Sequence, residues 1–189
     1  AKATQRRQTL AVTASIGPGA MNLVTASALA TVNRLPLLLL PGDTYATRRQ
    51  GVVLQQLEDP SDPGLTVNDA FRPVSRFFDR ITRPEQLITS LPQAFRVLAN
   101  PVETGAVVLS VSQDLQSMAY DFPVELFRER DWPIRRTAPQ AEEIHAIAEA
   151  IRGAEKPLII AGGGVHYSLA QEKLQQLGEA TGIPLSLIH

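Results

Sequence analysis

Cysteine is absent from this sequence of 189 residues, and tryptophan and histidine are scarce, at one and three residues. Without cysteine the chain forms neither disulfide bonds nor thiolate metal sites, which suits the reducing environment of the cytoplasm. The histidines, His145, His166 and His189, lack the close spacing to each other or to a carboxylate that metal sites use. We therefore expect a cytoplasmic protein that holds no metal ion with residues of this chain.

A strong charge of one sign and a long apolar run are also lacking. Lysine and arginine number 18 against 19 aspartates and glutamates, for a formal net charge of −1. Neither nucleic acid nor a membrane is therefore an expected partner. The longest strongly apolar run, residues 35–40, falls far short of the roughly 20 residues that span a bilayer. The first residues show no signal-peptide pattern.

Short apolar runs alternate with helical patterns along the chain, which predicts an α/β fold with parallel sheets. In the first part, strands are predicted at residues 9–14, 35–40 and 106–112, and helices at residues 20–32 and from 84 onward. Pro92 interrupts the second helix. Because proline lacks the N–H that an interior helical position donates, we expect two short pieces or a kink there.

From residue 113 the periodicity is lost, and prolines punctuate a charged passage, which predicts a surface linker. We place a first domain at residues 1–120, the linker at 121–138 and the start of a second domain at 139–189. The second domain is predicted to begin with a helix at residues 141–152 whose Ile144 and Ile147 face inward. Two strands and one crossover cannot cover both faces of a parallel sheet, so the chain looks like a fragment.

The segment at residues 15–22 is the strongest candidate for a binding site. Gly17 and Gly19 flank Pro18 between a predicted strand and a predicted helix, so a ligand could approach the backbone closely. Asn22 adds an amide that both donates and accepts hydrogen bonds. A second turn is predicted at residues 41–43, on the same edge of the sheet. The alternative is a tight strand-to-helix turn that binds nothing.

These residues resemble the pyrimidine-binding domain of thiamine-diphosphate (ThDP) enzymes of the acetolactate synthase and pyruvate oxidase type. The match runs through residues 17–20, Asn22, Pro36 and Gly42, and the chain departs from it by an inserted Ile16, by Met21 and by Asp43. The resemblance implies part of a three-layer domain with a parallel sheet, followed by the start of a Rossmann-like middle domain. It also implies that the pyrimidine of the cofactor lies against Gly17, Pro18, Gly19, Asn22 and Asp43.

Longer stretches, at residues 33–43, 46–49, 53–56 and 71–76, are similar to one branch of these enzymes. That branch hydrolyses a ring C–C bond of trihydroxycyclohexane-1,2-dione in inositol breakdown. The resemblance implies ThDP and Mg²⁺ as cofactors, a cyclic dione as substrate and a homodimer or homotetramer. The nearest alternative is an acetolactate synthase-like carboligase or decarboxylase.

Two parts that ThDP chemistry requires are missing from the sequence. The family's activating glutamate precedes the glycine segment, whereas the first acidic residue here is Asp43. The family's Mg²⁺-binding motif, Gly-Asp-Gly followed by Asn-Asn, does not occur either. We therefore assign no catalytic residue, expect the Mg²⁺ site outside this chain and predict that the isolated chain is inactive.

Two further features have open roles. Gly162 and Gly164 fit two positions of a dinucleotide-binding turn, but Tyr167 occupies the third glycine position, so we expect a structural role and no FAD. A non-catalytic nucleotide-binding module remains the second alternative. Arg48 and Arg49 could hold an oxygen-rich substrate or the carboxylate of a product, or they could belong to a solvated loop or an intersubunit salt bridge.

Overall fold

A computed structural model describes residues 6–48, 51, 53–62, 64–134 and 136–187 of the protein. The chain divides into two compact units. The first unit is Arg6–Pro133, and the second is Ile134–His189.

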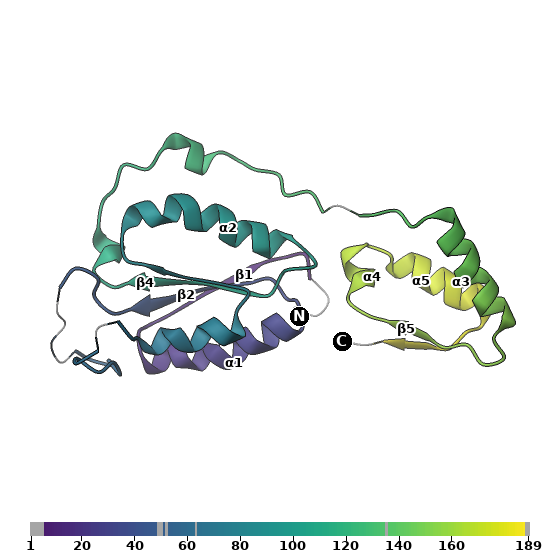
Figure 1. The fold of residues 1–189 in the computed structure, drawn as a ribbon, viewed down its shortest axis with the longest axis horizontal. Coiled ribbons are helices and arrows are strands. Elements are labelled where there is room, and N and C mark those ends of the chain that lie inside the picture. The colour runs from purple at the N-terminus through teal and green to yellow at the C-terminus, as the bar shows by residue number, and fades with distance from the viewer. Residues whose placement is uncertain (1–5, 49–50, 52, 63, 135, 188–189) are drawn as a thin grey trace. The chain divides into compact units, whose positions relative to one another are not determined.

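The first unit is built around a sheet of four parallel strands in the order β1-β2-β4-β3 (Figure 1). The strands are β1 (Leu10–Ala14), β2 (Leu37–Asp43), β3 (Phe77–Ile81) and β4 (Ala106–Ser112). Helix α1 (Pro18–Val32) covers one face of the sheet, and helix α2 (Leu87–Ala99) covers the other. The predicted three-layer α/β arrangement is therefore confirmed.

Strand β4 lies between two neighbours and is buried on both faces, as its uninterrupted apolar start predicts. Ala106 and Val108 pack in the core on the side of α1. Val107 and Leu109 pack in the core on the side of α2. The alternation of a strand thus divides one short sequence between two hydrophobic cores.

A 3₁₀ segment, η2 (Val67–Val74), packs beside α1 on the first of these faces. Its Phe71 is fully buried in the core that contains Ala20 and Ala30 of α1. Ser27 and Thr31 of α1 donate hydrogen bonds of 3.0 and 2.8 Å to the carbonyl oxygen of Val74. The small residues of α1 therefore let η2 approach the helix closely. Other 3₁₀ segments are η3 (Pro84–Gln86), η4 (Leu115–Ser117) and η5 (Val124–Phe127).

Helix α2 corrects one expectation, because it continues from Leu87 to Ala99 as a single helix with Pro92 inside it. Proline removes one backbone hydrogen bond, but the same helix buries Ala94, Val97 and Leu98 against the sheet. Burial of apolar side chains contributes about 1.5–3 kcal/mol each, which is enough to keep the helix intact across the missing bond.

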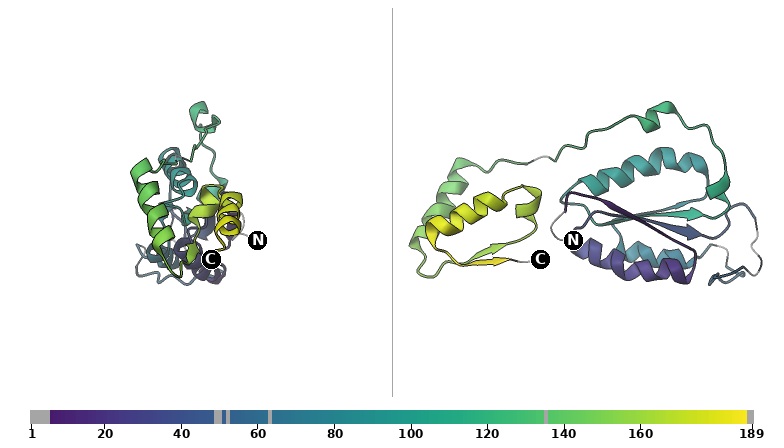
Figure 2. Two further views of the ribbon diagram at one scale, coloured as in Figure 1. Left: turned by 90° about the vertical axis from the view of Figure 1, so that its right-hand side faces the viewer. Right: turned by 180° about the vertical axis from the view of Figure 1, so that it is seen from behind.

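The second unit contains a pair of parallel strands, β5 (Ile159–Ala161) and β6 (Leu185–Leu187), with three helices (Figure 2). The helices are α3 (Ala141–Gly153), α4 (Gly164–Tyr167) and α5 (Gln171–Thr181). The prediction that Ile144 and Ile147 face a core is wrong, because they are 53% and 61% exposed. A pair of three-residue strands offers too little apolar surface to cover α3 as well as α5.

In the part of the chain that the structure describes, the helices are all too short or too polar to cross a membrane.

We predict that Phe71→Ala destabilises the first unit by about 3–5 kcal/mol, because the change leaves a cavity in a closed core. Phe127→Ala is the matched control, since Phe127 is 72% exposed and its loss should have little effect. Urea unfolding followed by the amide NMR signals of β4 measures both variants. Equal losses in the two variants would contradict the assignment of Phe71 to the core.

Candidate functional site

The carboxyl edge of the first sheet is formed by the glycine turn after β1 and by the end of β2. Gly17 has φ = 70° and is followed by Pro18 at the first position of α1, where the missing N–H of proline costs nothing. A Cβ at Gly17 would lie 1.8 Å from the carbonyl oxygen of Gln55, and one at Gly19 would lie 2.5 Å from Ser15 Oγ. Both positions therefore require glycine.

The turn residues differ in what they offer to a ligand. Pro18 and Asn22 are exposed and Gly19 is half-buried, whereas Gly17 is buried beneath the carbonyl of Gln55. The surface that a flat heterocycle can reach is thus made by Pro18, Gly19 and Asn22, and Gly17 gives the turn its shape.

The predicted second turn at residues 41–43 is wrong, because these residues continue β2 to Asp43. Pro41 pairs with Ala14 of β1, but the ladder to β4 shows no pair at Leu40 and Pro41 before it resumes at Gly42. The missing N–H of proline explains this gap. A Cβ at Gly42 would be 3.3 Å from the amide nitrogen of Ile16, so the end of β2 does lie against the glycine turn.

The carboxylate of Asp43 points into the fold and is fully buried. Its Oδ1 accepts a hydrogen bond of 2.8 Å from the Thr44 N–H. Its Oδ2 accepts bonds from Arg80 Nε at 3.0 Å and from Ser110 Oγ at 2.5 Å. Because the chain itself occupies both oxygens, the carboxylate acts here as a structural anion.

Arg80 joins this anion to η2. Its Nη2 donates to Asp69 Oδ2 at 2.8 Å and to Thr66 Oγ1 at 2.9 Å. Burial would lower the pKa of Arg80, but Asp69 and Asp43 outweigh it and raise that pKa. Burial would also raise the pKa of Asp69, but hydrogen bonds from Arg72, from the Thr66 N–H and from Arg80 lower it.

Asn68 completes this buried cluster. Its amide nitrogen donates at 2.8 Å both to the Gly42 carbonyl and to Ser110 Oγ. Sequence reasoning assigned no role to Asn68, Arg80 or Ser110. The residues of these pairs stand 26 to 67 positions apart, and no local pattern marks such partners.

A second carboxylate organises the loop that follows β2. Asp114 accepts hydrogen bonds from the N–H groups of Ala46 and Thr47 at 2.9 and 3.0 Å, and from Thr47 Oγ1 at 2.6 Å. Burial would raise the pKa of Asp114, but these bonds outweigh it and lower the pKa. The Arg48 guanidinium lies 4.3 Å from the centre of the Tyr45 ring. Arg49 lies outside the described residues.

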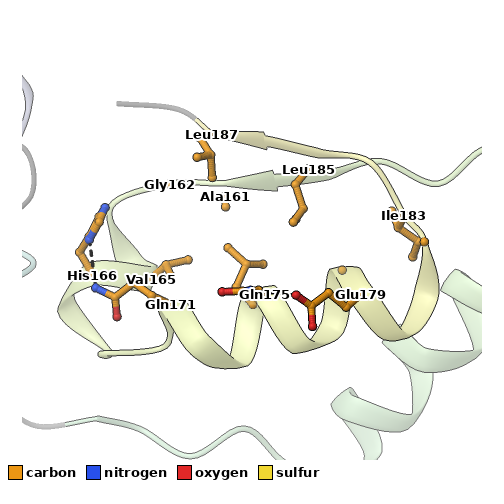
Figure 3. Close-up of a pocket in the computed structure, with 13 residues that line it drawn as sticks. Ala161, Gly162, Val165, His166, Gln171, Gln175, Glu179, Ile183, Leu185 and Leu187 are labelled. Atoms are coloured by element: carbon orange, nitrogen blue, oxygen red, sulfur yellow. Dashed lines mark hydrogen bonds between the residues drawn. The ribbon is translucent and has the colours of Figure 1, made fainter.

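The second unit has a cavity of about 510 Å³ between α5 and the strands β5 and β6 (Figure 3). Gly162 and His166 lie at one end, where His166 Nδ1 is 3.2 Å from Gln171 Nε2. Its lining contains no lysine or arginine that would bind a phosphate. The absence of a nucleotide at Gly162 and Gly164 stays a prediction.

No group of three or more histidine, aspartate or glutamate side chains among the described residues is arranged to hold a metal ion. The cofactor-facing surface of this chain is therefore made of backbone, proline and amide groups.

Comparison with known proteins identifies the class first. Residues 144–187 match the family described as the central domain of thiamine pyrophosphate enzymes. This match falls on the second unit, which contains α3, β5, α5 and β6. It confirms the resemblance to ThDP enzymes and the Rossmann-like character expected for that part.

Individual relatives make the comparison finer, and all of them are named 3D-(3,5/4)-trihydroxycyclohexane-1,2-dione hydrolase. The chain is 50% identical to the protein of Clostridium tetani over 184 residues. It is 50% identical to that of Clostridium perfringens over 185 residues and 46% identical to that of Geobacillus thermodenitrificans over 186 residues. These alignments cover 97–98% of this chain and 29% of each relative.

We predict that Gly17→Ala destabilises the first unit, by about 1–2 kcal/mol from the positive φ alone and by more from the clash with Gln55. Gly162→Ala is the matched control, because a Cβ there meets no atom within 4 Å. Thermal unfolding measures the loss, and the Gln55 amide signal reports the displaced loop. A Gly17→Ala variant as stable as the control would contradict the geometry of the turn.

A pH dependence follows from Asp69, whose pKa is lowered from its ordinary value of 3.8. A carboxylate with a lowered folded-state pKa stabilises the fold above its unfolded pKa, and this contribution is lost as the pH falls through the folded value. We therefore expect part of the acid-induced loss of stability, below about pH 4, to disappear in Asp69→Asn. Asp121→Asn, at an exposed position, is the control and should keep the full loss. The free energy of urea unfolding between pH 7 and pH 2 tests this, and identical pH profiles would contradict it.

Proposed function

We propose that this chain forms one wall of the cofactor site in a ThDP-dependent hydrolase that opens the ring of a trihydroxycyclohexane-1,2-dione. The observation that carries the proposal is the 46–50% identity to hydrolases of that name along nearly the whole chain. The chain spans about 29% of the length of these relatives, so the activity belongs to a longer polypeptide in this proposal.

The residues at the glycine turn fit the pyrimidine end of ThDP. The prohibited Cβ positions at Gly17 and Gly19 leave a backbone that a flat ring can approach. The exposed Asn22 amide offers a donor and an acceptor to ring nitrogen and amino groups. When bound, ThDP supplies the nucleophilic carbon that attacks a carbonyl group.

In this proposal Asp43 acts on the cofactor site through the backbone. Its carboxylate is held by Arg80 and Ser110 inside the fold, and the neighbouring Gly42 contacts the glycine turn. The pair of Asp43 and Arg80 thus fixes the distance between β2 and the turn. A fixed wall matters because catalysis depends on groups held within about 0.5 Å of their productive positions.

We also propose that Mg²⁺ and the activating glutamate are bound or supplied by parts outside these 189 residues. The isolated chain is then inactive, and the longer enzyme is a cytoplasmic homodimer or homotetramer. The absence of any acidic residue before Asp43 in the sequence supports a separate source for the activating acid.

The test uses the longer enzyme that contains this segment, assayed with the cyclic dione and, separately, with pyruvate. We expect ThDP-dependent ring opening and no turnover of pyruvate. Asn22→Ala should raise the ThDP concentration for half-maximal activity about tenfold, the equivalent of one hydrogen bond of about 1.4 kcal/mol. Asn33→Ala, at the far end of α1, is the control and should leave it unchanged. Turnover of pyruvate in place of the dione would favour a carboligase or decarboxylase.

A further inference from the structure

The loop at residues 44–48 is held at the carboxyl edge of the first sheet from two sides. At its root, the Gln113 N–H donates to the Asp43 carbonyl at 3.1 Å, which joins the ends of β2 and β4. At its middle, Asp114 accepts three hydrogen bonds from Ala46 and Thr47. The backbone that carries Arg48 is therefore fixed by groups that belong to the strand next to β2.

Arg48 differs from the other arginines at this edge in having a free hydrogen-bonding side. Arg72 also stacks on a ring, that of Phe78 at 4.4 Å, but it is paired with Asp69 at 2.7 Å. Arg48 is exposed and stacks on Tyr45, and within the described ranges no carboxylate pairs with it. Stacking occupies the face of the guanidinium and leaves its N–H edge available for a planar oxyanion.

The loop root lies beside the candidate cofactor wall. Gly42 contacts Ile16, next to the glycine turn, and β1 is separated from β4 by β2 alone. Strands in a sheet are about 4.8 Å apart. The carboxyl ends of β1 and β4, and so the turn and Asp114, are therefore about 10 Å apart across the sheet edge, a distance that a six-carbon substrate on the cofactor can bridge.

The chemistry of ring opening creates a ligand for this cation. Hydrolysis between two adjacent carbonyl carbons breaks one C–C bond. One carbon gains the oxygen of water and becomes a carboxylic acid, while the other gains a hydrogen and becomes an aldehyde. No oxidant is needed. The neutral ring thereby becomes an open chain with a carboxylate, because the acid loses its proton near neutral pH.

We propose that Arg48 binds the carboxylate that forms when the ring opens, with Tyr45 and Asp114 as its positioning residues. This inference rests on the proposed function for the identity of the ligand. A guanidinium suits the task because its paired N–H groups match the two oxygens of a carboxylate. The site distinguishes the anionic product from the neutral substrate by charge.

A binding experiment on the 189-residue chain tests the site without catalysis. The probes are gluconate, an open six-carbon hydroxy acid, and sorbitol, which has the same carbon chain without the carboxylate. We expect gluconate to shift the Arg48 side-chain Nε–H signal with a saturable, millimolar Kd, and sorbitol to leave it in place. Arg48→Gln should abolish binding, and Asp114→Asn should weaken it at least threefold.

Arg83→Gln is the matched control, since Arg83 is also an exposed arginine and lies outside the loop. It should bind gluconate like the unchanged chain. Equal effects of gluconate and sorbitol, or no saturation up to 100 mM, would overturn the proposal. A loss of binding in Arg83→Gln as large as that in Arg48→Gln would do the same, because it would indicate unspecific attraction to positive charge.

A kinetic experiment on the longer enzyme separates this inference from the proposed function. There, Arg48→Gln should raise the inhibition constant of the ring-opened product about tenfold while ring opening remains measurable. An enzyme that opens the dione with unchanged product inhibition in Arg48→Gln would disprove the role of Arg48 alone. An enzyme that never opens the dione, although the chain binds gluconate through Arg48, would disprove the proposed function and leave a carboxylate site.

Discussion

The buried ion pair between Asp43 and Arg80 is the interaction on which the edge of the first sheet depends. Asp43 is the last residue of β2, and Arg80 lies in β3, on the far side of β4. Breaking a buried pair by removing one partner costs about 3–5 kcal/mol, because the other charge is left uncompensated. Through Ser110 and Asn68 the same cluster reaches β4 and η2. One buried anion thus connects every element that supports the glycine turn.

The two parts of the candidate site differ in how tightly the fold controls them. The wall formed by Gly17, Pro18 and Gly19 is set by sterics, since two of its residues have no room for a Cβ. The loop with Arg48 is set by hydrogen bonds to one exposed carboxylate, Asp114. A rigid wall suits a cofactor that stays in place, and a more adjustable loop suits a substrate that changes shape and charge during the reaction.

Much of the fold could be predicted from the sequence, because apolar periodicity reports which elements form. β4 was placed at residues 106–112 without error. Local signals failed where a distant contact decided the outcome. The Pro41-Gly42 pair is a common turn signal, yet pairing with β1 keeps it extended. The amphipathic pattern of α3 indicated an apolar face, but periodicity carries no information on what covers that face. The partners of Asp43 could not be predicted at all, since their order along the chain is unrelated to their places in the sheet.

The central position of β4 has a consequence for the order in which the protein acquires its structure. β2 and β3 do not touch each other in the sheet, and β4, which follows both in the chain, separates them. During synthesis, the first hundred residues therefore carry two strands whose shared neighbour does not yet exist. Non-local parallel pairing is slow, and unpaired strand edges favour aggregation. The unit can close only after Ser112 has left the ribosome, and until then its longest apolar strand, β2, has an unprotected side.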